Sequence, residues 1–187
     1  SQSIPQLLLS GVQGSGKTTL AQILIKAMNL DETDVLTINA SDERGIDTFR
    51  NSIKNFATSM AIGRFKIIHL EEADQLTPQA QAAMKRFMEE TSEYVRFILT
   101  CNHVSKIIAP IRSRCQELTF RAANKNDIAE YLIQILAFEN VKFDLTLLDR
   151  YVDYGYPDVR KIVNLLQQNS IGGELKSPDT ESETGDY

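Results

Sequence analysis

The residues most suited to chemistry form a glycine-rich run near the start of the chain. Residues 11–18 read GVQGSGKT and follow an apolar run at 7–9. Glycines let successive backbone N–H groups turn around an anion, Lys17 adds a positive charge, and the Thr18 hydroxyl can reach a magnesium ion. A chance glycine turn is disfavoured because all eight positions match between a predicted strand and a predicted helix. The run predicts a site for a nucleoside triphosphate and Mg²⁺. We expect its phosphate-binding residues to be Gly11, Val12, Gln13, Gly14, Ser15, Gly16, Lys17, Thr18 and Thr19.

Two adjacent carboxylates follow a later apolar run. Residues 66–70 read KIIHL, and Glu71 and Glu72 come directly after them. Acidic side chains at the carboxyl end of a buried strand lie where α/β sheets bind their ligands. One carboxylate could hold magnesium while its neighbour polarises the attacking water. The alternative is that both acids merely begin a solvated loop, and the glycine-rich run favours the chemical interpretation.

Two weaker signals come further along the chain. Asn102 follows the run FILTC at 97–101, where an amide could contact a γ-phosphate or orient water, although Asn is common in such turns. Arg112 and Arg114 lie in a short segment before the next apolar run. Taken alone, these arginines are best explained as ordinary surface residues.

Short apolar runs separated by helical patterns must position these groups. Continuous apolar runs typify strands that are covered on both faces, and their alternation with helices predicts a parallel sheet with right-handed crossovers. The fold class is therefore α/β, with a five-stranded parallel sheet flanked by helices. We expect strands at 6–10, 35–39, 66–70, 94–100 and 116–120, and helices at 18–30, 46–61 and 78–90, the second with Met60 on its apolar face.

After residue 120 the pattern is helical only. Asn124 or Asn126 can cap a first helix, Asp144 can cap a second, and Pro157 is expected to open a third. We predict three parts: a nucleotide-binding α/β domain at 1–121, a small three-helix domain at 122–171, and a disordered acidic tail at 172–187. The tail carries five acids against one lysine, a net charge of −4, which leaves −1 of the total −5 for the rest.

Composition excludes some broad classes. A hydrophobic content of 42% and a charged content of 24% are those of an ordinary globular protein. No apolar run approaches the roughly 18 residues that span a bilayer, so we expect no membrane partner. The two cysteines show no metal spacing and fit reduced thiols, which favours a cytoplasmic protein, or a nuclear one in a eukaryote.

Together these segments resemble the AAA+ ATPases, and more closely the small subunits of sliding-clamp loaders of the replication factor C and phage type, over about residues 6–170. Residues 39–46 resemble the loader segment after strand two, and 71–74 resemble the Asp-Glu-Ala-Asp box. Asn102 matches the sensor-1 position, 113–115 match the Ser-Arg-Cys motif, and 157–161 match the sensor-2 segment of the lid. Glu71 departs from the family, which usually has Asp there.

The resemblance implies roles for individual residues. Lys17 would contact the β- and γ-phosphates, Thr18 and Glu71 would bind the magnesium ion, and Glu72 would be the catalytic carboxylate. Asn102 would be catalytic as well, and Arg114 would act on ATP held by a neighbouring subunit. Arg160 would contact ATP from the lid, although a solvated helix face is the competing interpretation.

The resemblance also implies partners: other clamp-loader subunits, a sliding clamp and primer–template DNA. Arg50 and Lys54, spaced i and i+4 on a predicted helix, and Arg44 just before it could follow the DNA backbone. We expect an isolated chain to be mostly monomeric and a poor ATPase, since the ring-forming collar and the segment before the first strand are not recognisable. Two alternatives remain: another AAA+ DNA-processing motor of helicase or initiator type, or a weakly hydrolysing, nucleotide-dependent assembly subunit.

Overall fold

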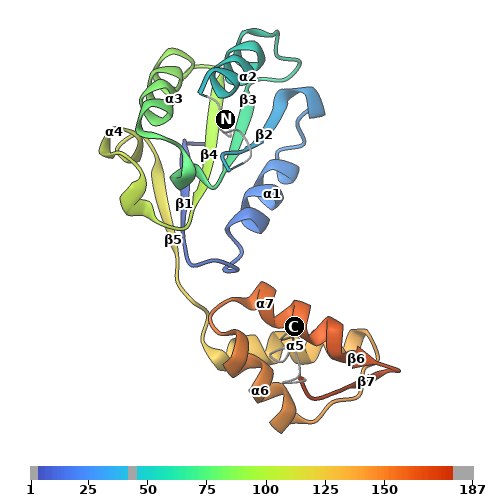
Figure 1. Cartoon of the computed structure of the whole chain (residues 1–187). Helices are drawn as coiled ribbons and strands as arrows, with labels where there is room; N and C mark the ends of the chain where they lie inside the picture. The colour runs from blue at the N-terminus through green and yellow to red at the C-terminus, as the bar shows by residue number, and fades with distance from the viewer. Residues whose placement is uncertain (1–3, 42–45, 179–187) are drawn as a thin grey trace, which may run out of the picture. The chain divides into compact units, whose positions relative to one another are not determined.

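The computed structural model describes residues 4–41 and 46–178, apart from the side chains of residues 46–49. Its contacts divide the chain into two compact units. One unit comprises Ser1–Gly11 and Gly16–Phe120, and the other comprises Val12–Ser15 and Arg121–Tyr187. The first unit carries the sheet, and the second carries the C-terminal helices (Figure 1).

The first unit is built on a five-stranded sheet of order β2-β3-β4-β1-β5, in which every pairing is parallel (Figure 1). This confirms the predicted α/β class. Two strands have the predicted bounds, and the other three differ by a residue at one or both ends. The strands are β1 (Leu7–Gly11), β2 (Val35–Asn39), β3 (Lys66–Glu71), β4 (Val95–Cys101) and β5 (Gln116–Phe120).

Side chains that alternate along the strands build a separate core on each face of the sheet. Leu7 and Leu9 pack on one face with Ala21 of α1 (Lys17–Ala27). Leu8 packs on the other face, in the cluster that holds Ile53 of α2 (Ile46–Thr58) and Met84 of α3 (Pro78–Glu90). Because side chains of a strand point alternately to the two faces, both faces of β1 are covered. This explains its continuous apolar sequence.

Local sequence signals set the helix ends. Thr77 caps α3 by accepting a hydrogen bond from the Ala80 amide, and Pro78 occupies the first turn as predicted. The predicted extension of α2 to residue 61 is wrong, because the helix ends at Thr58. Met60 lies beyond it with 95% of its surface exposed, and so is not part of the apolar face. Helix α1 is also shorter than predicted and ends at Ala27.

A buried cation holds the end of α2. The Lys66 side chain is 1% exposed, and its Nζ donates hydrogen bonds to the Phe56 carbonyl at 2.8 Å and the Ser59 carbonyl at 2.7 Å. The same Nζ lies 4.7 Å from the Phe56 ring centre. A lysine at a helix C-terminus satisfies carbonyls that have no partner within the helix. From its sequence position, Lys66 was predicted only as the first residue of a strand.

Short helical turns complete the first unit. They are the 3₁₀ turns η1 (Glu32–Asp34), η2 (Ala73–Gln75) and η3 (Val104–Lys106) and the four-residue helix α4 (Ala109–Arg112). The buried Gln81 side chain of α3 donates to the Lys106 carbonyl at 2.9 Å and accepts from the Ile108 amide at 2.9 Å. This amide therefore ties α3 to the segment that leads into α4.

Three helices form the core of the second unit, as predicted. Asn124 caps α5 (Lys125–Phe138), and Asp144 caps α6 (Leu145–Gly155). The prediction that Pro157 opens the third helix is wrong. Asp158 is the cap of α7 (Val159–Asn169), and its side chain accepts a hydrogen bond from the Lys161 amide, so the proline precedes the cap.

Ordered structure extends into the segment predicted as a disordered tail. Strands β6 (Ser170–Ile171) and β7 (Glu174–Leu175) pair antiparallel around Gly172 and Gly173, which have positive φ angles of 64° and 77°. Leu175 is 4% exposed and packs in the core of the three helices. The prediction was wrong over residues 172–175 because acidic composition concealed one buried leucine. The acidic residues from 179 onward lie outside the described residues.

Candidate functional site

The glycine-rich loop connects the end of β1 to the start of α1. Gly14 and Gly16 have φ angles of 72° and 91°, a backbone region that L side chains rarely adopt. Gly11 is needed for close approach, because a Cβ there would lie 2.2 Å from the Phe120 carbonyl oxygen of β5. The loop therefore needs glycine at these positions to turn between strand and helix.

The side chains of the loop suit an anionic ligand. The Lys17 side chain is 7% exposed, and its Nζ donates to the Gly11 carbonyl at 2.9 Å, across the base of the loop. Among the described residues, the buried side-chain polar atoms without a hydrogen-bond partner are Ser15 Oγ and His69 Nε2. An unpartnered hydroxyl at the N-terminus of an eleven-residue helix fits a bound phosphate. Thr18 and Thr19 occupy the first turn of that helix.

The two predicted carboxylates lie at the carboxyl end of β3, as their sequence position indicated. Glu71 pairs in register with Asn39 of β2, and Glu72 follows with φ 53° and ψ 42°. A left-handed glutamate is strained by roughly 1–3 kcal/mol, and such outliers cluster at functional sites. Since β4 lies between β3 and β1, the carboxylates share one edge of the sheet with the loop after β1.

A buried histidine, His69, lies two residues before Glu71 on β3. His69 is 1% exposed, and its Nε2 lies 3.9 Å from a Glu71 carboxylate oxygen. Burial lowers the pKa of His69 to about 4, because the charged imidazolium would lose its hydration. The imidazole is therefore neutral at pH 7, and the contact is not an ion pair.

Asn102 follows β4 at the same edge and is held through its backbone. The Asp74 carboxylate, 5% exposed, accepts hydrogen bonds from the Asn102 amide at 3.3 Å and the His103 amide at 3.0 Å. Asp74 lies in the motif at 71–74 but was not predicted as a site residue. The signal that could have identified it is its position, because it is an acid three residues after a buried strand. The next strand along the chain is followed by the polar residue Asn102.

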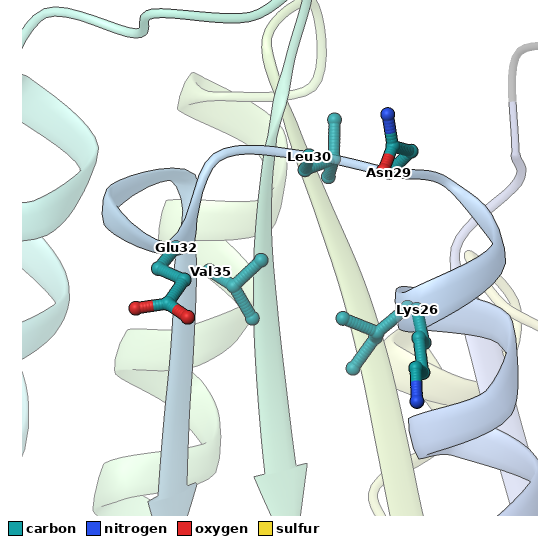
Figure 2. Close-up of a pocket in the computed structure, with 6 residues that line it drawn as sticks. Lys26, Asn29, Leu30, Glu32 and Val35 are labelled. Atoms are coloured by element: carbon teal, nitrogen blue, oxygen red, sulfur yellow. The ribbon is translucent and has the colours of Figure 1, made fainter.

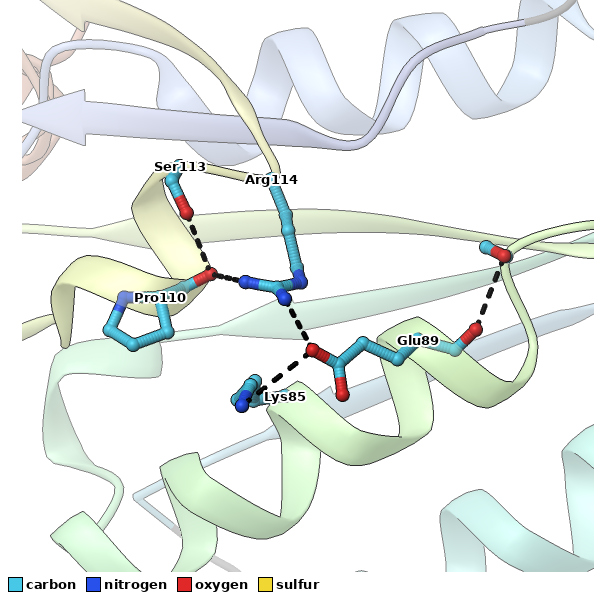
Figure 3. Close-up of polar contacts among 6 residues, drawn as sticks. Lys85, Glu89, Pro110, Ser113 and Arg114 are labelled. Carbon is cyan, nitrogen blue, oxygen red and sulfur yellow. Dashed lines mark hydrogen bonds and ion pairs between the residues drawn. The ribbon is translucent and has the colours of Figure 1, made fainter.

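Arg112 and Arg114 have different environments. Arg112 pairs within the unit with Glu117 at 3.1 Å. Arg114 is 36% exposed; its guanidinium donates to the Pro110 carbonyl at 2.6 Å and to the Glu89 carboxylate of α3 (Figure 3). The adjacent Cys115 packs against the core, and burial raises the pKa of its thiol to about 12. Cys115 thus acts as an apolar anchor beside a solvent-facing arginine.

The remaining predicted residues lie in other places. Arg50 and Lys54 are exposed on α2, one helical turn apart, and Arg44 lies outside the described residues. Arg160 is exposed on α7 of the second unit.

A pocket of about 400 Å³ surrounds the connection from α1 to β2 (Figure 2). Lys26 and Glu32 line it together with Ile25, Asn29, Leu30 and Val35. It lies at the opposite end of α1 from Lys17, so it does not belong to the glycine-rich loop.

The site and the sheet define a class of protein. Residues 7–122 match the family AAA, described as the ATPase family associated with various cellular activities, and the chain belongs to this family. Within the family, the chain is similar to replication factor C small subunits of archaea. It is 43% identical over 178 residues to that of Sulfurisphaera tokodaii, covering 93% of this chain and 54% of the relative. The subunit of Archaeoglobus fulgidus is 43% identical over 183 residues, covering 96% and 57%.

The chain spans about half the length of these curated relatives. Among solved structures it is similar to the Thermotoga maritima RuvB Holliday junction branch migration motor, with a TM-score of 0.71. That match covers 89% of this chain and 55% of the other at 14% identity, which establishes a shared fold alone. In the part of the chain that the structure describes, every helix is too short or too polar to cross a bilayer.

Proposed function

We propose that this chain is the ATPase core of a sliding-clamp loader small subunit, which couples ATP binding and hydrolysis to loading a clamp on primer–template DNA. The observation that carries the proposal is the joint placement of the glycine-rich loop, Glu72 and Asn102 at one edge of the sheet, in a chain 43% identical to replication factor C small subunits. The RuvB likeness adds no preference for a helicase motor, because it rests on 14% identity.

Each residue at that edge has a chemical role in the proposal. The loop 11–19 binds the triphosphate, and Lys17 stabilises charge on its terminal phosphates. Thr18 and Glu71 hold Mg²⁺, which when bound neutralises phosphate charge. Glu72 accepts a proton from the attacking water, and Asn102 orients that water. Arg160, in the helical domain at 122–171, contacts the nucleotide. The nucleotide-binding domain ends near residue 121.

Arg114 acts in trans in this proposal. Its loop lies on the surface of the first unit, where a neighbouring subunit can present its nucleotide to it. An arginine supplied in trans accelerates phosphoryl transfer by about 10³ to 10⁵. Assembly with other loader subunits therefore completes each active site, and an isolated chain turns over ATP slowly.

The exposed cations of α2 supply the DNA contact. Arg50 and Lys54 lie off the apolar face, and Arg44 precedes the helix in sequence. Contacts to phosphates are independent of base sequence and suit a protein that recognises primer–template junctions by their backbone. The sliding clamp is the second partner, and the site of action is the cytoplasm, or the nucleus in a eukaryote.

The test is ATP turnover by the full protein assembled with its partner subunits, with and without clamp and primer–template DNA. We expect turnover to rise severalfold only when both are present, and Lys17→Ala to abolish it. Stimulation by branched or duplex DNA without a clamp would instead identify another AAA+ motor. ATP binding with no turnover in any assembly would identify a nucleotide-dependent assembly subunit.

A further inference from the structure

Arg114 needs support to act on a neighbouring nucleotide. It follows α4, a helix of only four residues, and is 36% exposed. An arginine side chain loses about 2 kcal/mol of rotamer entropy when it is immobilised. A short surface loop cannot by itself hold such a side chain in one direction.

Two contacts hold the guanidinium in this chain (Figure 3). One nitrogen donates to the Pro110 carbonyl of the preceding helix α4 at 2.6 Å. The other terminal nitrogen donates to the carboxylate of Glu89, which comes from α3, 25 residues away in sequence. The guanidinium is thus tied at two points, one local and one on a different element.

Glu89 lies on α3, a helix that is packed against the core. It lies in the last turn of α3, whose Met84 and Met88 are buried in the core. Gln81 joins the same helix to the backbone just before α4. A functional group supported by a packed helix is positioned more closely than one supported by its loop alone.

The charges around Arg114 leave it able to attract an anion. Lys85 lies 3.6 Å from the same Glu89 carboxylate oxygen, so Lys85, Glu89 and Arg114 carry a net charge of +1 (Figure 3). A guanidinium has five N–H donors, and the two contacts described use two of them. The others can reach a phosphate without breaking the pair.

We propose that Glu89 is a positioning residue for Arg114, holding the guanidinium in the direction in which it meets the nucleotide of the neighbouring subunit. This inference rests on the proposed function, because it assigns Glu89 a role only if Arg114 acts in trans. Glu89 itself does not touch the nucleotide.

The test compares Glu89→Gln with Glu90→Gln in the assembled complex. Glu90 is the matched control, since it is the next residue on α3 and pairs with the exposed Arg86 instead. We expect Glu89→Gln to lower kcat for ATP about tenfold or more with KM nearly unchanged, because a misplaced catalytic group slows the chemical step. Glu90→Gln should retain the parent kcat.

A double-mutant cycle separates positioning from a general effect on structure. In an Arg114→Ala background, Glu89→Gln should cause no further loss, whereas a structural defect would add to it. Unchanged or raised kcat in Glu89→Gln, or a further loss in that background, would overturn the inference. If Arg114→Ala leaves turnover unchanged, the proposed trans role of Arg114 fails instead, and the two failures are therefore distinct.

Discussion

Individual side chains at the carboxyl edge of the sheet are held by contacts that need no nucleotide. Lys17 donates to the Gly11 carbonyl, and Asp74 accepts hydrogen bonds from the two peptide N–H groups on either side of Asn102. Fixed positions of this kind reduce the reorganisation required when substrate binds. Glu71 differs, because its neighbour His69 is neutral and offers it no ion pair.

Glu71 is also where the chain departs from the family it resembles, which usually has Asp. The longer side chain keeps the charge but moves the carboxylate by about one methylene, and Mg²⁺ demands near-ideal octahedral geometry. We therefore expect Glu71→Asp to retain or raise ATP turnover of the assembled complex at saturating Mg²⁺. Titrating Mg²⁺ against turnover checks this, with Glu72→Asp as the control that should lose activity. A large loss in Glu71→Asp would mean that the glutamate is specifically required.

Among the elements, α2 combines a rigid attachment with an exposed basic face. Ile53 is fully buried, and Lys66 ties the helix end to β3, while Arg50 and Lys54 remain exposed. The helix can therefore present two cations at a fixed spacing of one turn.

Replacing both cations tests the DNA contact. Each neutralised phosphate contributes about 0.9 to the slope of log affinity against log salt, or about 0.7 on single strands. Arg50→Ala with Lys54→Ala should weaken primer–template binding, lower that slope by about two, and reduce DNA-stimulated turnover, while ATP binding is unchanged. Lys26→Ala with Arg86→Ala removes two exposed cations from α1 and α3 and is the control for net charge. Equal slopes in the two double variants would argue against a DNA role for α2.

Sequence reasoning succeeded where local signals decide structure. The strand 35–39, the helix 78–90 with its Thr77 cap, and the caps Asn124 and Asp144 all have the predicted places. It failed where the deciding contact is distant in sequence. Leu175 is ordered by packing on three helices, and Met60 is exposed because α2 stops early. The partners Asp74 and Glu89 reach residues 25 or more positions away, which no spacing rule specifies.

On the scale of the whole molecule, the nucleotide-binding edge and Arg114 serve two different active sites in our proposal. In the proposal, the loop, Glu72 and Asn102 act on the ATP that the same chain binds. Arg114 acts on the ATP that a neighbouring subunit binds. Turnover should then depend on contact between subunits rather than on the fold of one chain.

The most direct test of this claim is turnover in assemblies that contain neighbouring copies of the chain, prepared with two different defects. Arg114→Ala removes the group supplied to the neighbour, and Glu72→Gln removes the chain's own catalytic carboxylate. Each variant alone should be nearly inactive. Random mixing should restore turnover at about one interface in four, where an intact Glu72 meets an intact Arg114. A mixture that assembles but stays as inactive as the separate variants would contradict the account.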